Sequence, residues 1–150
     1  MSTKQKILDW HDDIIYAKKH TFKSLLDEKD KNSQKVTNAF EKLKTVDAES
    51  SEFSIYSEQI DRLNQRNKEL ESKYQTDMKK KFKEFHRKYE NIYTMMVNGT
   101  IDEETLTHVL NMYDRVENGH IDKKAGMNQG MDFMTQKYKL PKDFFNRDAV

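Results

Sequence analysis

Cysteine is absent from this chain of 150 residues, which excludes disulfides, thiolate metal sites and cysteine nucleophiles. Proline occurs once, at Pro141, and glycine only four times. Sheet proteins need many tight turns, and tight turns use glycine and proline, so this scarcity favours an all-α fold. Apolar residues make up 35% of the chain, against about 45–50% in ordinary globular domains. The core is therefore expected to be thin, as in helices that pack in pairs.

Long apolar runs and a strong charge of one sign are missing too. The net charge is +1, so no global field attracts nucleic acid or an anionic membrane. No apolar run approaches the roughly 18–20 residues that span a membrane, and the first residues lack the apolar core of a signal peptide. We therefore expect a cytoplasmic protein with no membrane partner. The Lys-, Asn- and Asp-rich composition fits an accessory protein of a low-GC bacterium or its phage.

Signatures of catalysis and of cofactor binding are also missing. The chain has no glycine-rich phosphate loop, no HExxH motif and no GxSxG nucleophile turn. No two of its five histidines are four residues apart, the spacing that places two metal ligands on one helix face. We therefore expect no enzymatic activity, no cofactor and no metal site.

The most informative feature that is present is an apolar series from Phe53 to Met96, in steps of three and four residues. No glycine or proline interrupts it, so it predicts one very long central helix over about 52–97, roughly 65–70 Å long. The first half has the heptad spacing of a coiled coil. Three steps of four between Leu70 and Phe82 then bring the mean period close to 3.6. An elongated helical hairpin or helical bundle with little supercoil is therefore expected.

A helical arm is predicted before the central helix. Apolar periodicity over about 3–46 indicates that this arm folds back on the central helix, and the two form a first domain at 1–97. The stretch 27–35 has no apolar residue, so the arm either continues through it as a solvated helix or breaks near Asn32. The candidate N-caps are Ser2 or Thr3 for the arm and Ser50 or Ser51 for the central helix.

The last third of the chain, 98–150, predicts a small C-terminal helix pair and a tail. An Asn-Gly dipeptide at 98–99 and another at 118–119 each end a helix, and each is followed by the same Ile-Asp pair. Thr100 and Glu103 match a capping box for the first helix of this pair. The two turns are either an internal duplication or the shared chemistry of helix–glycine–helix connections.

Two features of the central helix are candidates for interaction. Asn67 interrupts the apolar series; a buried asparagine can fix register and oligomer state, whereas an exposed one would do neither. A basic patch follows, with charges that can track phosphates or pair with an acidic surface; it consists of Lys79, Lys80, Lys81, Lys83, Arg87 and Lys88. The aromatic residues within it, Phe82 and Phe85, belong to the apolar series, which argues against stacking on bases.

An adaptable apolar strip is the third candidate, and we expect it to dock a partner chain or a second copy. It consists of Met127, Met131, Met134, Phe144 and Phe145. Methionine and aromatic side chains are enriched in interfaces, and methionine adapts to irregular partners. The alternative is that the two phenylalanines fold back and close the local core.

These patterns predict a non-catalytic helical module for protein–protein interaction. An adaptor, chaperone, scaffold or host-factor inhibitor, for example of a phage or secretion system, needs such a part. Because the long apolar stripe exceeds what a short arm covers, we expect a homodimer with Asn67 near the contact. The alternative is a nucleic-acid-binding regulator that uses the basic run 79–88.

Overall fold

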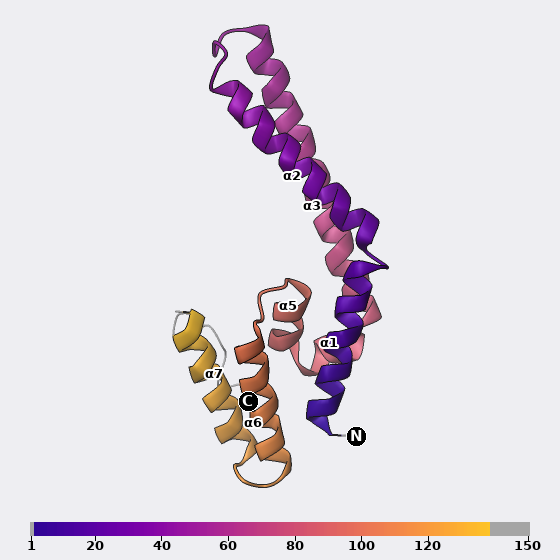
Figure 1. Ribbon diagram of the computed structural model, residues 1–150, viewed down its shortest axis with the longest axis vertical. Coiled ribbons are helices and arrows are strands. Elements are labelled where there is room, and N and C mark those ends of the chain that lie inside the picture. The colour runs from indigo at the N-terminus through magenta and orange to yellow at the C-terminus, as the bar shows by residue number, and fades with distance from the viewer. Residues whose placement is uncertain (1, 139–150) are drawn as a thin grey trace. The chain divides into compact units, whose positions relative to one another are not determined.

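The computed structural model describes residues 2–138, apart from the side chains of six residues near its end: Lys123, Met127, Gly130, Met131, Met134 and Tyr138. Within the described residues the protein has seven α-helices and no strand (Figure 1), so the all-α prediction is confirmed. The chain forms two compact units. The hairpin unit is Asp13–His86, and the terminal unit joins the start of the chain up to Asp12 with the part from Arg87 onward. The predicted boundary after residue 97 falls inside the terminal unit.

The hairpin unit is built on two antiparallel helices, α2 (Lys23–Leu43) and α3 (Ser51–Lys81), which pack along their lengths (Figure 1). The stretch 27–35 is helical and lies within α2, which answers the question that the sequence left open. The Oγ of Ser50 accepts a hydrogen bond from the Phe53 N–H at 3.2 Å, so the predicted serine cap of α3 is confirmed.

The arm breaks at a place that the sequence did not indicate, between α1 (Thr3–Lys19) and α2. Phe22 stands at this break, with φ −105° and ψ 11°. Its side chain is 6% exposed, and its ring packs edge-on against Tyr74 of α3, with 5.4 Å between the ring centroids. Burial of one aromatic ring against α3 therefore accompanies the break.

The expectation of an unbroken helix over 52–97 is wrong. The long central helix is present as α3, but it ends at Lys81 and is followed by the short helices α4 (Lys83–Lys88) and α5 (Glu90–Val97). The breaks fall at Phe82 and Tyr89, where φ is −117° and −136°. Aromatic residues have only moderate helix propensity, so packing of their rings can override it. Phe82 is 6% exposed, and the Tyr89 ring contacts those of Trp10 and Tyr113, at 6.1 and 5.3 Å between centroids.

The terminal unit contains the expected helix pair, α6 (Glu103–Glu117) and α7 (Lys123–Tyr138), which pack against each other. Gly126 allows their close approach, because a Cβ at this position would lie 2.5 Å from Cγ2 of Val116. The imidazole of His108 on α6 stacks on the Phe133 ring of α7, with centroids 3.9 Å apart and ring planes 11° apart.

The two Asn-Gly turns share one geometry. Gly99 and Gly119 have φ of 70° and 74°, and each donates a hydrogen bond of 3.2 Å to the carbonyl three residues earlier. In each turn the next N–H bonds at 2.9 Å to the carbonyl five residues earlier, which completes a Schellman motif. The predicted Thr100 cap is wrong, because this motif places Thr100 ahead of the helix. Asp102 and Asp122 are the caps, and each carboxylate accepts an N–H at 2.8 Å.

Candidate functional site

A polar seam crosses the middle of the hairpin where the apolar series is interrupted. The Nδ2 of Asn32 donates to the Oδ1 of Asn67 at 3.1 Å. The Nδ2 of Asn67 in turn donates to the Lys29 carbonyl at 3.3 Å and to the Ser33 Oγ at 3.2 Å. Asn32 is 7% exposed. Asn67 is therefore paired within its own chain, and any part it has in oligomerisation stays a prediction.

Ion pairs between the two helices flank the polar seam. Arg66 donates to both carboxylate oxygens of Glu28, at 2.7 and 3.3 Å, and these bonds lower the pKa of Glu28. Lys29 pairs with Glu71 and lowers the pKa of that carboxyl, while burial acts in the opposite direction. Because each pair joins α2 to α3, the seam and its neighbours specify one register for the hairpin.

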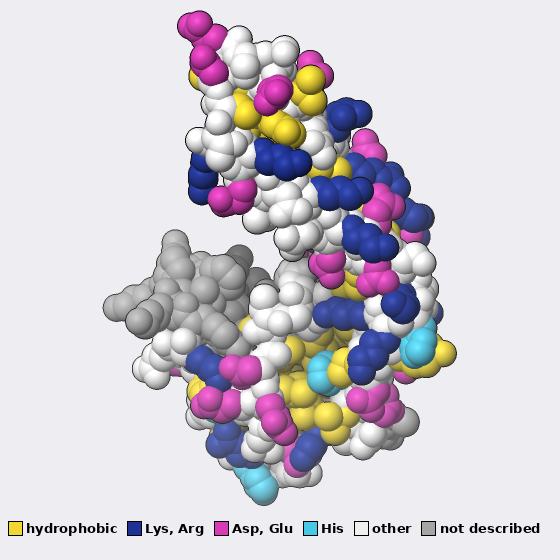
Figure 2. All heavy atoms as spheres, turned by 45° about the horizontal axis from the view of Figure 1, so that its top comes forward, with side chains coloured by type: hydrophobic (Ala, Val, Ile, Leu, Met, Phe, Trp, Pro, Cys, Tyr) yellow, Lys and Arg dark blue, Asp and Glu magenta, His cyan; other side chains and the backbone are white. Residues whose placement is uncertain are grey.

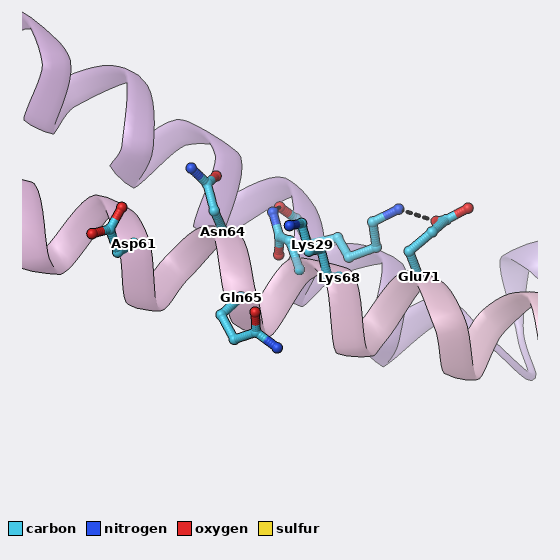
Figure 3. Close-up of a pocket in the computed structure, with 7 residues that line it drawn as sticks. Lys29, Asp61, Asn64, Gln65, Lys68 and Glu71 are labelled. Carbon is cyan, nitrogen blue, oxygen red and sulfur yellow. Dashed lines mark hydrogen bonds and ion pairs between the residues drawn. The ribbon is translucent and has the colours of Figure 1, made fainter.

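A shallow groove of about 650 Å³ lies beside the seam (Figure 3). Its lining combines Lys29 of α2 with residues of α3, namely Asp61, Asn64, Gln65, Asn67, Lys68 and Glu71. In Figure 3 the Lys29 side chain reaches along the groove to Glu71, and Gln65 points away from α2. The groove therefore presents amides and charges of both signs, without an apolar wall.

Exposed apolar side chains lie at the two ends of the hairpin unit. Among the described residues, the exposed large hydrophobic side chains are Ile15 (37%), Tyr16 (63%), Phe40 (50%) and Ile55 (60%). Phe40 and Ile55 belong to the hairpin tip, defined as residues 36–64, which contains the α2–α3 connection. Ile15 and Tyr16 belong to the open end, defined as residues 13–27 and 73–86. Figure 2 shows hydrophobic side chains at the tip with carboxylates around them.

The basic patch is exposed at all six positions, and the aromatic residues within it are buried, as the sequence predicted: Phe82 is 6% and Phe85 0% exposed. The structure divides the patch, because Lys79–Lys83 belong to the hairpin unit whereas Arg87 and Lys88 belong to the terminal unit. At the open end, Lys80 and Lys81 line a second groove of about 660 Å³, together with Phe22, Leu25 and Lys73.

The predicted apolar strip lies largely outside the described residues. The backbone of Met127, Met131 and Met134 belongs to α7, but their side chains, and Phe144 and Phe145 altogether, are not described. The expected docking by this strip stays a prediction.

Sequence reasoning missed a lysine that connects the two helices of the terminal pair. The Nζ of Lys137 on α7 lies 2.8 Å from the Asp102 carboxylate and 2.6 Å from that of Glu104. With the Thr105 N–H, Lys137 lowers the pKa of Asp102 to about 2. The sequence did contain a sign of this ion pair. Lys137 lies in the last turn of one helix, and the antiparallel neighbour of that helix begins with acidic residues.

Among the described residues, no group of three or more His, Asp or Glu side chains could hold a metal ion, and no helix is both long and apolar enough to cross a membrane. Comparison of the chain with protein-family models, with curated proteins and with solved structures finds no match. The candidate site is therefore chosen from the structure alone. It is the hairpin unit, which has exposed apolar side chains at both ends and a polar seam between them.

Proposed function

We propose that this chain is a non-catalytic protein-interaction module whose binding surfaces are the two ends of the hairpin unit. The observation that carries the proposal is the placement of exposed apolar side chains, two at the tip and two at the open end. Large apolar side chains exposed to water are candidates for burial in an interface, and these four are the exposed ones among the described residues. An adaptor, a chaperone, a scaffold or an inhibitor of a host factor would use such ends, in a bacterial or phage setting.

The polar seam supports this function by holding the two ends at a fixed separation. Helix α3 has 31 residues, which corresponds to about 46 Å at 1.5 Å per residue. The asparagine pair and the two flanking ion pairs favour one register of α2 on α3. A surface that is already ordered loses less conformational entropy on binding, which raises affinity.

Site-specific photo-crosslinking in the native cell tests the proposal. A crosslinking amino acid replaces Phe40 or Ile55 at the tip, or Ile15 or Tyr16 at the open end. The matched control replaces Lys31, an exposed residue in the middle of α2. We expect crosslinked products, with a foreign protein or with a second copy, from positions 40 and 55 but not from 31. Failure of positions 15, 16, 40 and 55 to crosslink to any protein would refute the function.

A second function, binding of nucleic acid, is favoured by the lysines of the open end. Lys79, Lys80, Lys81 and Lys83 are all exposed at the end of α3. Fluorescence anisotropy with single-stranded RNA and duplex DNA at about 50 and 200 mM salt tests this alternative, since phosphate contacts give a steep loss of affinity with salt. Burial of Phe82 and Phe85 leaves the patch without stacking platforms, so we rank this function second.

A further inference from the structure

The two ends of the hairpin unit carry opposite charge. The tip contains six Asp and Glu residues and three Lys and Arg residues, whereas the open end contains eight lysines and four Asp and Glu residues. Salt bridges within each end, such as Lys44–Glu41 at the tip and Lys73–Asp77 at the open end, join opposite charges and leave these net charges unchanged. The tip is therefore acidic and the open end is basic.

The two ends cannot neutralise each other within one hairpin. Glu52 of the tip and Lys81 of the open end lie near opposite ends of α3, which is about 46 Å long. The Debye length at physiological salt is about 8 Å, so their attraction across one molecule is screened. Each end also has two exposed apolar side chains, Phe40 with Ile55 and Ile15 with Tyr16. Tip and open end therefore match in apolar character and are complementary in charge.

We propose that a second copy of this chain occupies these surfaces, with two hairpin units packed antiparallel so that the acidic tip of each lies on the basic open end of the other. The inference rests on the proposed function and names the partner. Two-fold symmetry makes both contacts at once and closes the assembly as a dimer.

The middle of the hairpin is compatible with such an axis. Asp61 and Lys68 lie seven residues apart, which places them on one face of α3, and both line the central groove (Figure 3). A two-fold axis between Asn64 and Gln65 sets Asp61 of one copy level with Lys68 of the other. Asp61 and Lys68 then pair as opposite charges across the axis, and the asparagine pair stays within each hairpin.

Reversal of charge at each end tests the proposal. The tip variant carries Glu49→Lys and Glu52→Lys, the open-end variant carries Lys80→Glu and Lys81→Glu, and the control carries Lys31→Glu and Lys35→Glu in the middle of α2. Sedimentation equilibrium measures the dimer dissociation constant of each. We expect each end variant to weaken its own dimer at least about tenfold, because the tip changes from −3 to +1 opposite a basic end, whereas the open end changes from +4 to 0 and no longer attracts the acidic tip. An equimolar mixture of the two end variants should restore the dimer, since each reversed end meets its new complement.

Single-cysteine variants test the antiparallel geometry, because the natural chain has no cysteine. Under oxidation, Gln65→Cys should link to itself across the two-fold axis, since a disulfide needs its Cα atoms within about 7 Å. Ser54→Cys, at the tip, should not. Self-linkage of Ser54→Cys, whether or not Gln65→Cys also links, would indicate a parallel dimer and overturn the proposal.

The remaining outcomes separate this inference from the proposed function. A wild-type chain that is monomeric at every concentration and salt, yet crosslinks to a foreign protein from position 40, overturns the dimer and leaves the function standing. A monomer whose open end binds RNA, and loses it with Lys80→Glu and Lys81→Glu, overturns the dimer in favour of nucleic acid. Failure of the mixed variants to associate also overturns it. Crosslinking from none of the exposed apolar positions refutes the function itself.

Discussion

Replacing the two seam asparagines by leucine, singly and together, measures how strongly they depend on each other. Asn67→Leu removes the acceptor of the 3.1 Å bond from Asn32. Asn32 is 7% exposed, so water has little access to the N–H that loses its partner. A buried donor without a partner costs about 1–3 kcal/mol. A half-buried leucine at position 67 returns about 1 kcal/mol. Asn67→Leu also removes the two bonds that Asn67 donates to Lys29 and Ser33. Alone, it should therefore lower the free energy of unfolding by at least about 1 kcal/mol.

The double variant, Asn32→Leu with Asn67→Leu, should recover that loss. It leaves no buried amide and extends the apolar series of the hairpin. A leucine at position 32 becomes nearly fully buried and contributes about 2 kcal/mol, with about 1 kcal/mol more from position 67. The three lost hydrogen bonds of the seam subtract about 1 kcal/mol each. We therefore expect a free energy of unfolding close to that of the wild type and clearly above that of Asn67→Leu alone.

Urea unfolding followed by circular dichroism at 222 nm gives the four free energies of this double-mutant cycle. Lys31→Leu, at an exposed position of α2, is the control and should change stability by less than about 0.5 kcal/mol. If Asn67→Leu alone is as stable as the double variant, Asn32 does not depend on Asn67 and the reasoning is refuted.

Three further predictions concern the terminal unit. The pKa of Asp102 is about 2 rather than 3.8, so its ion pair with Lys137 should stabilise the α6–α7 pair above about pH 4, and this stabilisation should be lost as the pH falls towards 2. The melting temperature of Asp102→Asn should therefore depend less on pH in this range than that of the wild type. Asp122→Asn, which changes the cap of α7, is the control. Burial beside Phe133, and secondarily Arg115, lowers the pKa of His108 below 6.5. The stabilisation that comes from neutral His108 is then fully present above pH 6.5 and is lost as the pH drops through the lowered pKa. An equal loss of stability on acidification in His108→Gln would contradict this. Gly126→Ala sets a methyl 2.5 Å from Val116 and should cost about 1–3 kcal/mol in thermal unfolding.

Features that depend on neighbours a few residues away could be derived from the residue pattern alone. The three- and four-residue spacing of apolar side chains identified an all-α chain with a long central helix, because this spacing places them on one helix face. The cap of α3 was limited to Ser50 or Ser51, because a short hydroxyl side chain reaches the N–H three residues later, and the structure has Ser50 in this role. Gly99 and Gly119 marked both C-terminal turns, because glycine adopts the positive φ that a Schellman motif requires.

Features whose partners lie far along the chain depend on how the helices pack, which the residue pattern does not contain. Phe22 breaks the arm against Tyr74, and Tyr89 interrupts the central segment between Trp10 and Tyr113; none of these sites has the glycine or proline that marks a local break. Asn67 read as either a buried or an exposed polar position, and only its pairing with Asn32, 35 residues away, distinguished the two. Helix periodicity reports which residues share a face. Which residues pack against that face depends on the arrangement of whole helices. In that packing, one buried ring or one paired amide can outweigh the local helix propensity of several residues.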